Sequence, residues 1–277
     1  MKNPYRIETP AVISFSGGRS SGFMLWKILE AYNHQLPDDI KVVFCNTGLE
    51  HHETYEFIHR IEQNWCKIVW LEYCLDEATK EIPRDDGIDV ITVTKQSYKI
   101  VDYETASRNG EPFDLMIMKK KFLPNPIARI CTQRLKVEPL QKYIEWSQYS
   151  KAIGLRADEP RRVVKMRDRD DVILPMADAK HHRGDVMEFW IGEDMDLNLP
   201  LQGNIFSNCV GCFLKGYRSL EDIARTDPKY FEWWINTEVK TGHKFRNDRP
   251  CYATIKANAY RQLAFDFGDT VDCFCTD

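Results

Sequence analysis

The first third of the chain alternates apolar runs with amphipathic segments. Nearly continuous apolar runs, rich in β-branched and aromatic residues, occur at 11–16, 41–47 and 67–73 and predict buried parallel strands. Between them, segments 21–33 and 52–65 repeat apolar residues on one helical face. Strand, helix and strand in succession predict right-handed crossovers and therefore a Rossmann-like, doubly wound, mainly parallel α/β sheet.

The hydrophobic periodicity weakens in the middle of the chain and then becomes regular again. Turn signals between about 76 and 127 surround one short alternating strand at 89–94, which indicates an insertion. Periodicity then predicts helices at 132–147 and 184–193 and strands at 151–156 and 171–176.

Beyond residue 200, two helical segments lie among glycines and cysteines. We therefore predict an α/β domain over 1–176 and a mostly helical, cysteine-bearing C-terminal part over 177–277.

Composition narrows the class of protein. Of the 277 residues, 43% are hydrophobic, and no apolar run approaches the roughly 18 residues that a membrane span needs, so we expect a soluble protein without a membrane partner. The first ten residues lack the apolar centre of a secretory signal, which favours a cytoplasmic location. The nine cysteines should then serve metal binding, redox chemistry or burial rather than structural disulfides.

The charge of the chain excludes one class of function. A net charge of −4 rules out nucleic-acid binding through the global field of the protein. Local basic runs at 119–121 and 161–171 remain, and such runs usually form solvated surface.

The stretch SFSGGRSSG follows the first predicted strand and opens a helix. This position exposes unpaired backbone amides and the positive end of the helix dipole, which attract anions. Glycines let the backbone approach a phosphate, and serines offer hydroxyl groups to its oxygens. The stretch fits neither the P-loop nor the GxGxxG motif. The alternative is a tight turn with helix-capping serines.

The stretch resembles the SGGxxS pyrophosphate loop of the adenine-nucleotide α-hydrolase superfamily, the N-type ATP pyrophosphatases. Later stretches resemble motifs of its phosphoadenosine phosphosulfate (PAPS) reductase-like family in the family's order. They are VVFCNTGLEHHETYEF, CTQRLKVEPLQKYI, IGLRADEPRR and LPMADAKHHRGDVMEFW. The resemblance covers most of residues 11–215 and implies an α/β fold of the α-hydrolase type whose 1–176 domain binds nucleotide.

The resemblance implies a site for ATP or a related adenine nucleotide. The phosphates would be wrapped by the loop, and adenosine or Mg²⁺ would be met by residues after the second strand. Three arginines would act catalytically by clamping the anionic leaving or transferring group, since guanidinium forks suit phosphate and sulfate oxygens. The nucleotide-binding residues expected on this basis are Ser14, Ser16, Gly17, Gly18, Arg19, Ser20, Ser21, Asn46, Thr47, Glu50, Arg134, Lys136, Gly154, Asp158 and Glu159, and the arginines are Arg156, Arg161 and Arg162.

One loop residue departs from the related pattern. Many ATP-cleaving members of the superfamily read SGGxDS, and Ser20 stands here at the position of the aspartate that helps to manage the metal. Nucleotide binding is therefore better supported than magnesium-dependent cleavage of ATP.

Five cysteines stand apart from the others. Cys209 and Cys212 form a CxxC pair, Cys273 and Cys275 form a CxC pair, and Cys131 opens a predicted helix whose N-terminus would favour its thiolate. These spacings alone are compatible with structural zinc or a thiol–disulfide pair.

The resemblance favours an iron–sulfur cluster over zinc. Adenylylsulfate reductases and DNA phosphorothioation enzymes hold a [4Fe–4S] cluster at places that match Cys131, Cys209 and Cys212. The resemblance therefore implies such a cluster here, and we expect Cys273 or Cys275 as its fourth ligand. Adenylylsulfate reductases carry adjacent cysteines before this helix, whereas residue 130 is isoleucine here. The chain also lacks the family's C-terminal ECG.H nucleophile segment, so Cys273 or Cys275 could act as catalytic nucleophile instead.

Three functions remain open from the sequence. The first is a PAPS reductase-like enzyme that activates the α-phosphate of an adenine nucleotide, releases pyrophosphate and transfers sulfur with help from the cluster. The second is a sulfonucleotide reductase that releases sulfite. The third is a non-catalytic accessory subunit that binds nucleotide or nucleic acid. The expected partners are a nucleic acid as acceptor, a sulfur- or electron-donor protein, and further copies of the chain in a homo-oligomer.

Overall fold

A computed structural model describes residues 3–84, 87–144, 148–200 and 205–261, with the backbone alone at 79–84 and 87–91. Its centre is a six-stranded sheet in the order β4-β3-β2-β1-β5-β6. All neighbouring strands are parallel except β3 and β4, which are antiparallel. The strands are β1 (Ala11–Ser14), β2 (Ile40–Asn46), β3 (Val69–Arg84), β4 (Gly87–Val101), β5 (Ser150–Ile153) and β6 (Val172–Ile173). The predicted mainly parallel α/β fold is confirmed.

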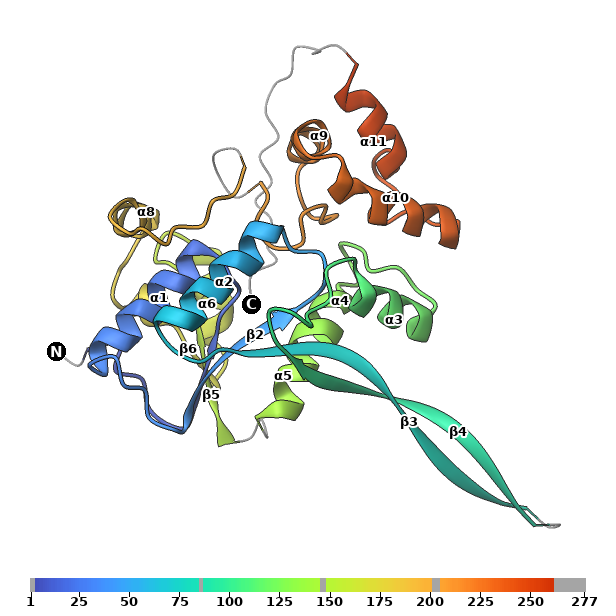
Figure 1. The fold of residues 1–277 in the computed structure, drawn as a ribbon, viewed down its shortest axis with the longest axis horizontal. Helices are drawn as coiled ribbons and strands as arrows, with labels where there is room; N and C mark the ends of the chain where they lie inside the picture. Colours follow the sequence, from blue (N-terminus) through green and yellow to red (C-terminus); the bar gives the residue numbers. More distant parts are fainter. Residues whose placement is uncertain (1–2, 85–86, 145–147, 201–204, 262–277) are drawn as a thin grey trace.

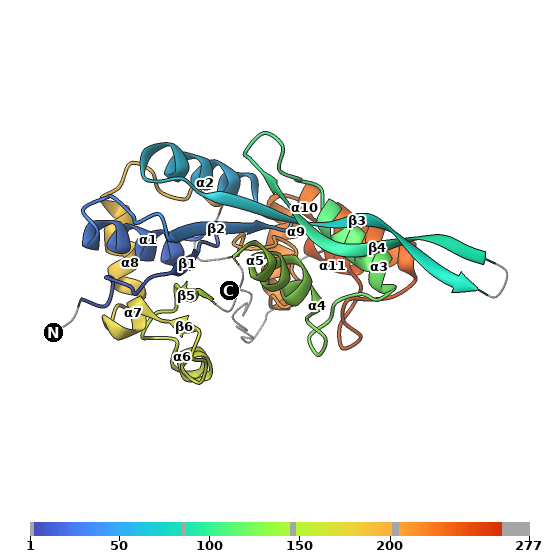
Figure 2. The ribbon, with the colours of Figure 1, turned by 90° about the horizontal axis from the view of Figure 1, so that it is seen from below.

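Helices cover both faces of the sheet (Figure 2). Helices α1 (Arg19–Ala31), α2 (His52–Asn64) and α8 (Arg183–Ile191) share one core with the sheet, in which Trp190 is fully buried. On the opposite face, α5 (Glu138–Tyr143) packs Leu140 against Val12 and Val43. Helices α6 (Pro160–Arg167) and α7 (Pro175–Asp178) pack against β5 and β6.

A second core lies beyond the carboxyl ends of the strands. It joins α3 (Glu111–Lys120), the short α4 (Ile130–Thr132) and the C-terminal helices α9 (Tyr217–Thr226), α10 (Lys229–Thr241) and α11 (Tyr252–Ala259) (Figure 1). Trp234 and Tyr252 are buried there and stack on each other. The predicted helical character of the C-terminal part is thus present in the residues described, while a domain boundary at 176 stays a prediction.

The expected insertion differs from the prediction. The short strand expected at 89–94 is the middle of β4, and the strand expected at 67–73 continues as β3 to Arg84, so the two form a long hairpin that extends away from the body (Figure 1). This pairing is hard to recognise in the sequence, since charged residues and the turn signal RDDG interrupt the apolar pattern. Cross-strand partners contribute more to strand formation than the local pattern does.

The expected helix at 132–147 is interrupted. A π-helical turn, η1 (Gln133–Val137), separates α4 from α5. Pro139 has no amide hydrogen to donate to the carbonyl of Leu135, and its ring would clash with that carbonyl in a regular helix. The wider π turn avoids the clash, so the structural effect of Pro139 begins in the turn before it.

A buried carboxylate holds the base of the hairpin to the rest of the sheet. Glu72 is fully buried, and its carboxylate accepts hydrogen bonds from Asn46 Nδ2 at 2.6 Å and from the amide and hydroxyl of Ser107 at 2.5 and 3.0 Å. Lys99 Nζ lies 3.0 Å from Glu72 Oε2 and supplies the balancing charge.

We predict that Glu72→Ala lowers the free energy of unfolding by about 3 kcal/mol or more, because it leaves buried donors and a lysine without their acceptor. The exposed Glu77 of the same strand is the matched control, and Glu77→Ala should change this free energy by less than about 0.5 kcal/mol. Urea unfolding followed by circular dichroism measures both. Equal effects of the two substitutions would contradict the assigned role of Glu72.

The N-terminus of α2 depends on a neutral histidine. His51 is 3% exposed, and its Nδ1 accepts a hydrogen bond from the amide of Glu53 at 3.2 Å. Burial lowers the pKa of His51 from 6.5 to about 4. The unfolded chain therefore binds this proton at higher pH than the folded chain does, so the protein loses stability as the pH falls from about 6.5 towards 4.

Replacing His51 by asparagine, which caps helices without titrating, should remove this part of the pH dependence. Between pH 7 and pH 4 the wild type is expected to lose about 3 kcal/mol more unfolding free energy than His51→Asn, as judged from the pKa difference. Denaturant titrations at a series of pH values provide the test. Parallel pH profiles for the two proteins would show that His51 is not the group responsible.

Candidate functional site

The glycine-rich loop runs from the end of β1 into α1, as predicted. Gly17 has φ +72°, which favours glycine, and a Cβ there would lie 2.7 Å from Ile58 and Thr54. Gly154, at the end of β5, packs beside the first turn of α1, where a Cβ would lie 3.2 Å from the Cα of Ser21. These two glycines bring strand ends and the helix N-terminus close together, which is the geometry that presents backbone amides to an anion.

The loop serines have different roles in the structure. Ser21 is buried, and its hydroxyl lies within hydrogen-bonding distance of the amides of Ser16 and Gly18 and of the Gly18 carbonyl, at 3.2, 3.3 and 2.9 Å. Ser21 therefore shapes the loop from inside. The hydroxyl of Ser20 instead accepts a hydrogen bond from Arg156 Nη1 at 3.1 Å.

Arg19 is turned away from the loop. Its guanidinium forms a bidentate pair with Asp196 at 2.7 and 2.8 Å and also donates to the Leu197 carbonyl. Trp190 Nε1 donates to the Arg19 carbonyl at 2.9 Å. Arg19 thus holds the loop against the segment that follows α8.

The arginines after β5 are ordered by neighbouring acids. Arg156 Nε donates to Asp158 at 2.8 Å, and the Arg156 amide donates to Glu159 at 3.1 Å. Arg162 Nη1 donates to the other oxygen of Glu159 at 2.5 Å. Arg161 is exposed at the start of α6. The two acids therefore orient Arg156 and Arg162.

The turn after β2 is a closed network. Asn46 is fully buried and accepts from the Gly48 amide and the Tyr55 hydroxyl, both at 3.0 Å. Glu50 is also buried and accepts from the Thr47 hydroxyl at 2.7 Å and from Tyr55 at 3.1 Å. Burial, followed by the charge of Glu50, raises the pKa of Tyr55 well above its ordinary value. Most polar atoms of Asn46, Thr47 and Glu50 thus hold the turn itself in shape.

A polar pocket lies beside the loop on the α5 side of the sheet. Ser14, Ser16, Cys45, Lys136 and Lys151 contribute to its lining. The Cys45 thiol donates to the Lys136 carbonyl, and burial raises the pKa of Cys45 to about 11. Two serines and two lysines beside the loop suit a phosphorylated ligand.

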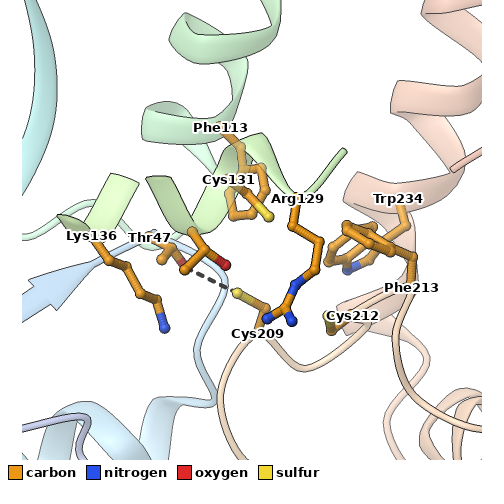
Figure 3. A pocket seen from close by; sticks show the side chains of 10 residues that line it. Thr47, Phe113, Arg129, Cys131, Lys136, Cys209, Cys212, Phe213 and Trp234 are labelled. Carbon is orange, nitrogen blue, oxygen red and sulfur yellow. Dashed lines mark hydrogen bonds between the residues drawn. The ribbon is translucent and has the colours of Figure 1, made fainter. Parts of the chain in front are cut away.

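A second pocket collects the cysteines. Cys131 on α4 and Cys209 and Cys212 on the facing loop line it together (Figure 3). The other lining residues are Thr47, Phe113, Arg129, Thr132, Lys136, Phe213 and Trp234. Lys136 therefore belongs to both pockets. Arg134, in contrast, pairs with Glu138 and donates to Gln96 of β4.

Hydrogen bonding and burial act on two of the pocket thiols. Thr47 donates its hydroxyl hydrogen to Glu50, so the contact of 3.3 Å between Thr47 Oγ1 and Cys209 Sγ takes its hydrogen from the thiol. Burial raises the pKa of Cys131. The expected effect of the helix N-terminus is present, because the backbone amides of Cys131 and Thr132 lower this pKa, but burial outweighs it.

The donor set matches a thiolate-bound metal centre in kind. Three cysteines from two distant segments meet at one pocket, and none of its lining residues is acidic. Within the described ranges, however, no three His, Cys, Asp or Glu side chains are arranged to hold a metal ion. Cys273 and Cys275, the expected fourth ligand or nucleophile, lie outside the described residues.

Several lining residues were not predicted as site residues. Arg129 and Thr132 flank Cys131 in sequence, and that proximity was the available signal. Lys151 is a buried cation within a short strand, which is itself unusual and could have marked it. Phe113 and Trp234 give no such signal, because only the fold brings them to the pocket.

The helices of the described residues include none that is both long and apolar enough to cross a membrane.

Comparison with known proteins identifies the family. The family model described as "Phosphoadenosine phosphosulfate reductase domain" matches residues 10–198. A curated relative, "Uncharacterized nin region protein ORF290" of Escherichia phage lambda, is 29% identical over 240 residues, which cover 85% of this chain and 76% of the relative. An uncharacterized protein of Methanocaldococcus jannaschii is 28% identical over 251 residues, which cover 85% of this chain and 43% of that protein. No solved structure matches. Since the family model spans more than half of the sequence, the chain belongs to the phosphoadenosine phosphosulfate reductase domain family, whose members bind nucleotides.

Proposed function

We propose that this protein is an enzyme that binds an adenine nucleotide at the SGGRSS loop and performs sulfur chemistry at the adjacent thiol pocket. The observation that carries the proposal is the shared lining residue, Lys136, which belongs both to the pocket beside Ser14 and Ser16 and to the pocket of the three cysteines. A nucleotide held by the loop would therefore present its phosphates or sulfate next to the thiols.

The chain's own groups supply binding and charge stabilisation. The first turn of α1 directs backbone amides at the loop opening, since its N-cap, Gly18, has no side chain to occupy them. Arg156 and Arg162, already oriented by Asp158 and Glu159, stabilise negative charge that develops on the transferred group. Lys136 provides a further cation between the nucleotide and the thiols.

Cys131, Cys209 and Cys212 would hold a [4Fe–4S] cluster, with Cys273 or Cys275 as the fourth ligand and zinc as the alternative occupant. When bound, the cluster supplies one-electron chemistry or a site that binds sulfur.

Two reactions are consistent with this site. In the first, an acceptor oxygen attacks the α-phosphate of ATP and releases pyrophosphate before sulfur transfer. In the second, a sulfonucleotide such as PAPS is reduced with two electrons to sulfite by a thiol donor. The arrangement around Ser20 favours the second reaction, because Arg156 occupies the neighbourhood in which other members have an aspartate, and Asp158 and Glu159 already bind arginines.

Anaerobic purification followed by product analysis tests the proposal. We expect about four irons and equivalent sulfide per chain, and turnover of either ATP or PAPS. Cys209→Ser should lose the iron and the turnover, whereas Cys66→Ser, at a half-buried cysteine in the other core, should keep both.

Lys136→Met should retain the colour but lose most of the turnover, because it removes charge without removing a ligand. A colourless protein with one zinc per chain would contradict the cluster. Tight nucleotide binding without turnover of ATP or PAPS would favour the accessory subunit instead.

The role of Ser20 gives a separate prediction. Nucleotide affinity of the wild type should change less than about threefold when Mg²⁺ is replaced by EDTA, because arginines rather than a carboxylate-bound metal face the phosphates. Ser20→Asp should bind about tenfold more weakly in EDTA and recover with Mg²⁺, since a carboxylate repels phosphate unless a cation lies between them.

Isothermal titration with ATP and with PAPS measures these affinities. Ser20→Asn, which is similar in size to aspartate and uncharged, is the control and should show no rescue by Mg²⁺. A wild-type affinity that collapses in EDTA would show that the site depends on a metal ion.

A further inference from the structure

Cationic side chains hold the loop that carries Cys209 and Cys212. Lys215 Nζ donates to the carbonyls of Ile205 and Ser207 at 2.5 and 2.7 Å, which closes the loop on itself. Arg249 donates to the carbonyls of Phe213 and Lys215, both at 2.8 Å. The carbonyls before and after the cysteine pair are therefore bonded to full positive charges.

Lys215 is buried and Arg249 is half-buried, and neither is paired with an acid among the described residues. Lys215 is 3% exposed, and burial lowers the pKa of Arg249. Among the described residues, no ion pair joins a carboxylate to Lys215 or to Arg249. Carbonyl oxygens solvate a cation but do not neutralise it, so the buried charge of Lys215 carries a substantial desolvation cost and the half-buried charge of Arg249 a smaller one.

The nearby acids are engaged elsewhere. Glu238 accepts hydrogen bonds from the amides of Phe245 and Tyr252 at 3.1 and 2.8 Å. Asp248 pairs with Arg246, at a largely exposed carboxylate. Glu50 accepts hydrogen bonds from Thr47 and Tyr55 in the turn after β2.

Two further cationic side chains lie at the thiol pocket itself. Arg129 and Lys136 line it, and none of its lining residues carries a carboxylate. Arg249 also interacts electrostatically with Cys212, whose thiolate would stabilise the charge of the arginine. Cations therefore lie on the wall of the pocket and behind its cysteine loop.

We propose that Lys215 and Arg249 provide the positive charge that makes the thiol pocket a site for an occupant of net negative charge. This inference rests on the proposed function, in which Cys131, Cys209 and Cys212 are metal ligands. Three thiolates around a divalent ion or a [4Fe–4S]²⁺ cluster leave a net charge of roughly −1, and the fourth thiolate of the proposed set would make it roughly −2, which Lys215 and Arg249 would help to balance. Both residues act through the loop and the field and touch no reacting atom, so they are positioning residues.

Paired substitutions separate charge from loop bonding. Lys215→Gln keeps a donor for a carbonyl and removes the charge, whereas Lys215→Arg keeps the charge. The probe is Co²⁺, titrated into the reduced, metal-free full-length chain and followed by its thiolate charge-transfer absorption. We expect Lys215→Gln to weaken Co²⁺ binding about tenfold or more and Lys215→Arg to stay within about threefold of the wild type. Lys244→Gln, at an exposed lysine, is the control and should match the wild type.

The reduction potential of the purified holoprotein gives an independent readout. Loss of a nearby positive charge disfavours the added electron, so Lys215→Gln should shift the midpoint potential to more negative values, and Lys215→Arg should leave it in place. Arg249→Gln and Arg249→Lys form a second pair if Lys215→Gln does not fold, as judged by thermal unfolding.

The outcomes distinguish this inference from the proposed function. A wild type that binds neither Co²⁺ nor a cluster contradicts both. A wild type that binds metal, with neutral variants of unchanged affinity and potential, contradicts only the role of Lys215 and Arg249 and leaves them as structural links of the loop.

Discussion

Backbone pairing between Glu50 and Cys209 joins the two cores of this molecule. The two residues form an isolated antiparallel bridge, and the Val210 amide donates to the Leu49 carbonyl at 2.8 Å. Leu49 belongs to the second core, while Tyr55, one turn into α2, belongs to the first. The turn after β2 is therefore fixed from both sides, and its buried carboxylate is fully satisfied. Because the turn and the cysteine loop are joined by backbone hydrogen bonds, a small shift of the turn backbone would also move the cysteine loop.

Charge is distributed unequally between the two halves of the site. Around the glycine-rich loop, Arg19, Arg156 and Arg162 are each paired with an acid, which orders their guanidinium groups. Such preorganisation reduces the entropy lost on binding. Behind the cysteine loop, Lys215 and Arg249 bond to backbone carbonyls rather than to acids. Basic side chains are thus paired with acids in one half of the site and with backbone carbonyls in the other.

The parallel strands of the sheet and the loop that follows β1 could be predicted from the sequence. The apolar run ending in SGG predicted the strand, its burial and the turn, and Cys131 reached the pocket of Cys209 and Cys212 as the resemblance implied. The pairing of Arg19 with Asp196 could not be predicted, because Asp196 is far away in sequence and lies in a segment without periodicity. The hairpin was underestimated for a similar reason, since its strands are defined by each other rather than by local pattern. Long-range pairing is the information that single-sequence reasoning lacks.

The π-helical turn sets the angular relation between Cys131 and Lys136. Five residues along a regular α-helix rotate a side chain by about 140°, which would direct these two to different sides. A π turn closes between residues five apart and therefore brings them near the same side. Both do line the thiol pocket. The widened turn is thus a register device: it takes up one extra residue, so Lys136, five positions after Cys131, lies where the fourth residue would lie in a regular helix.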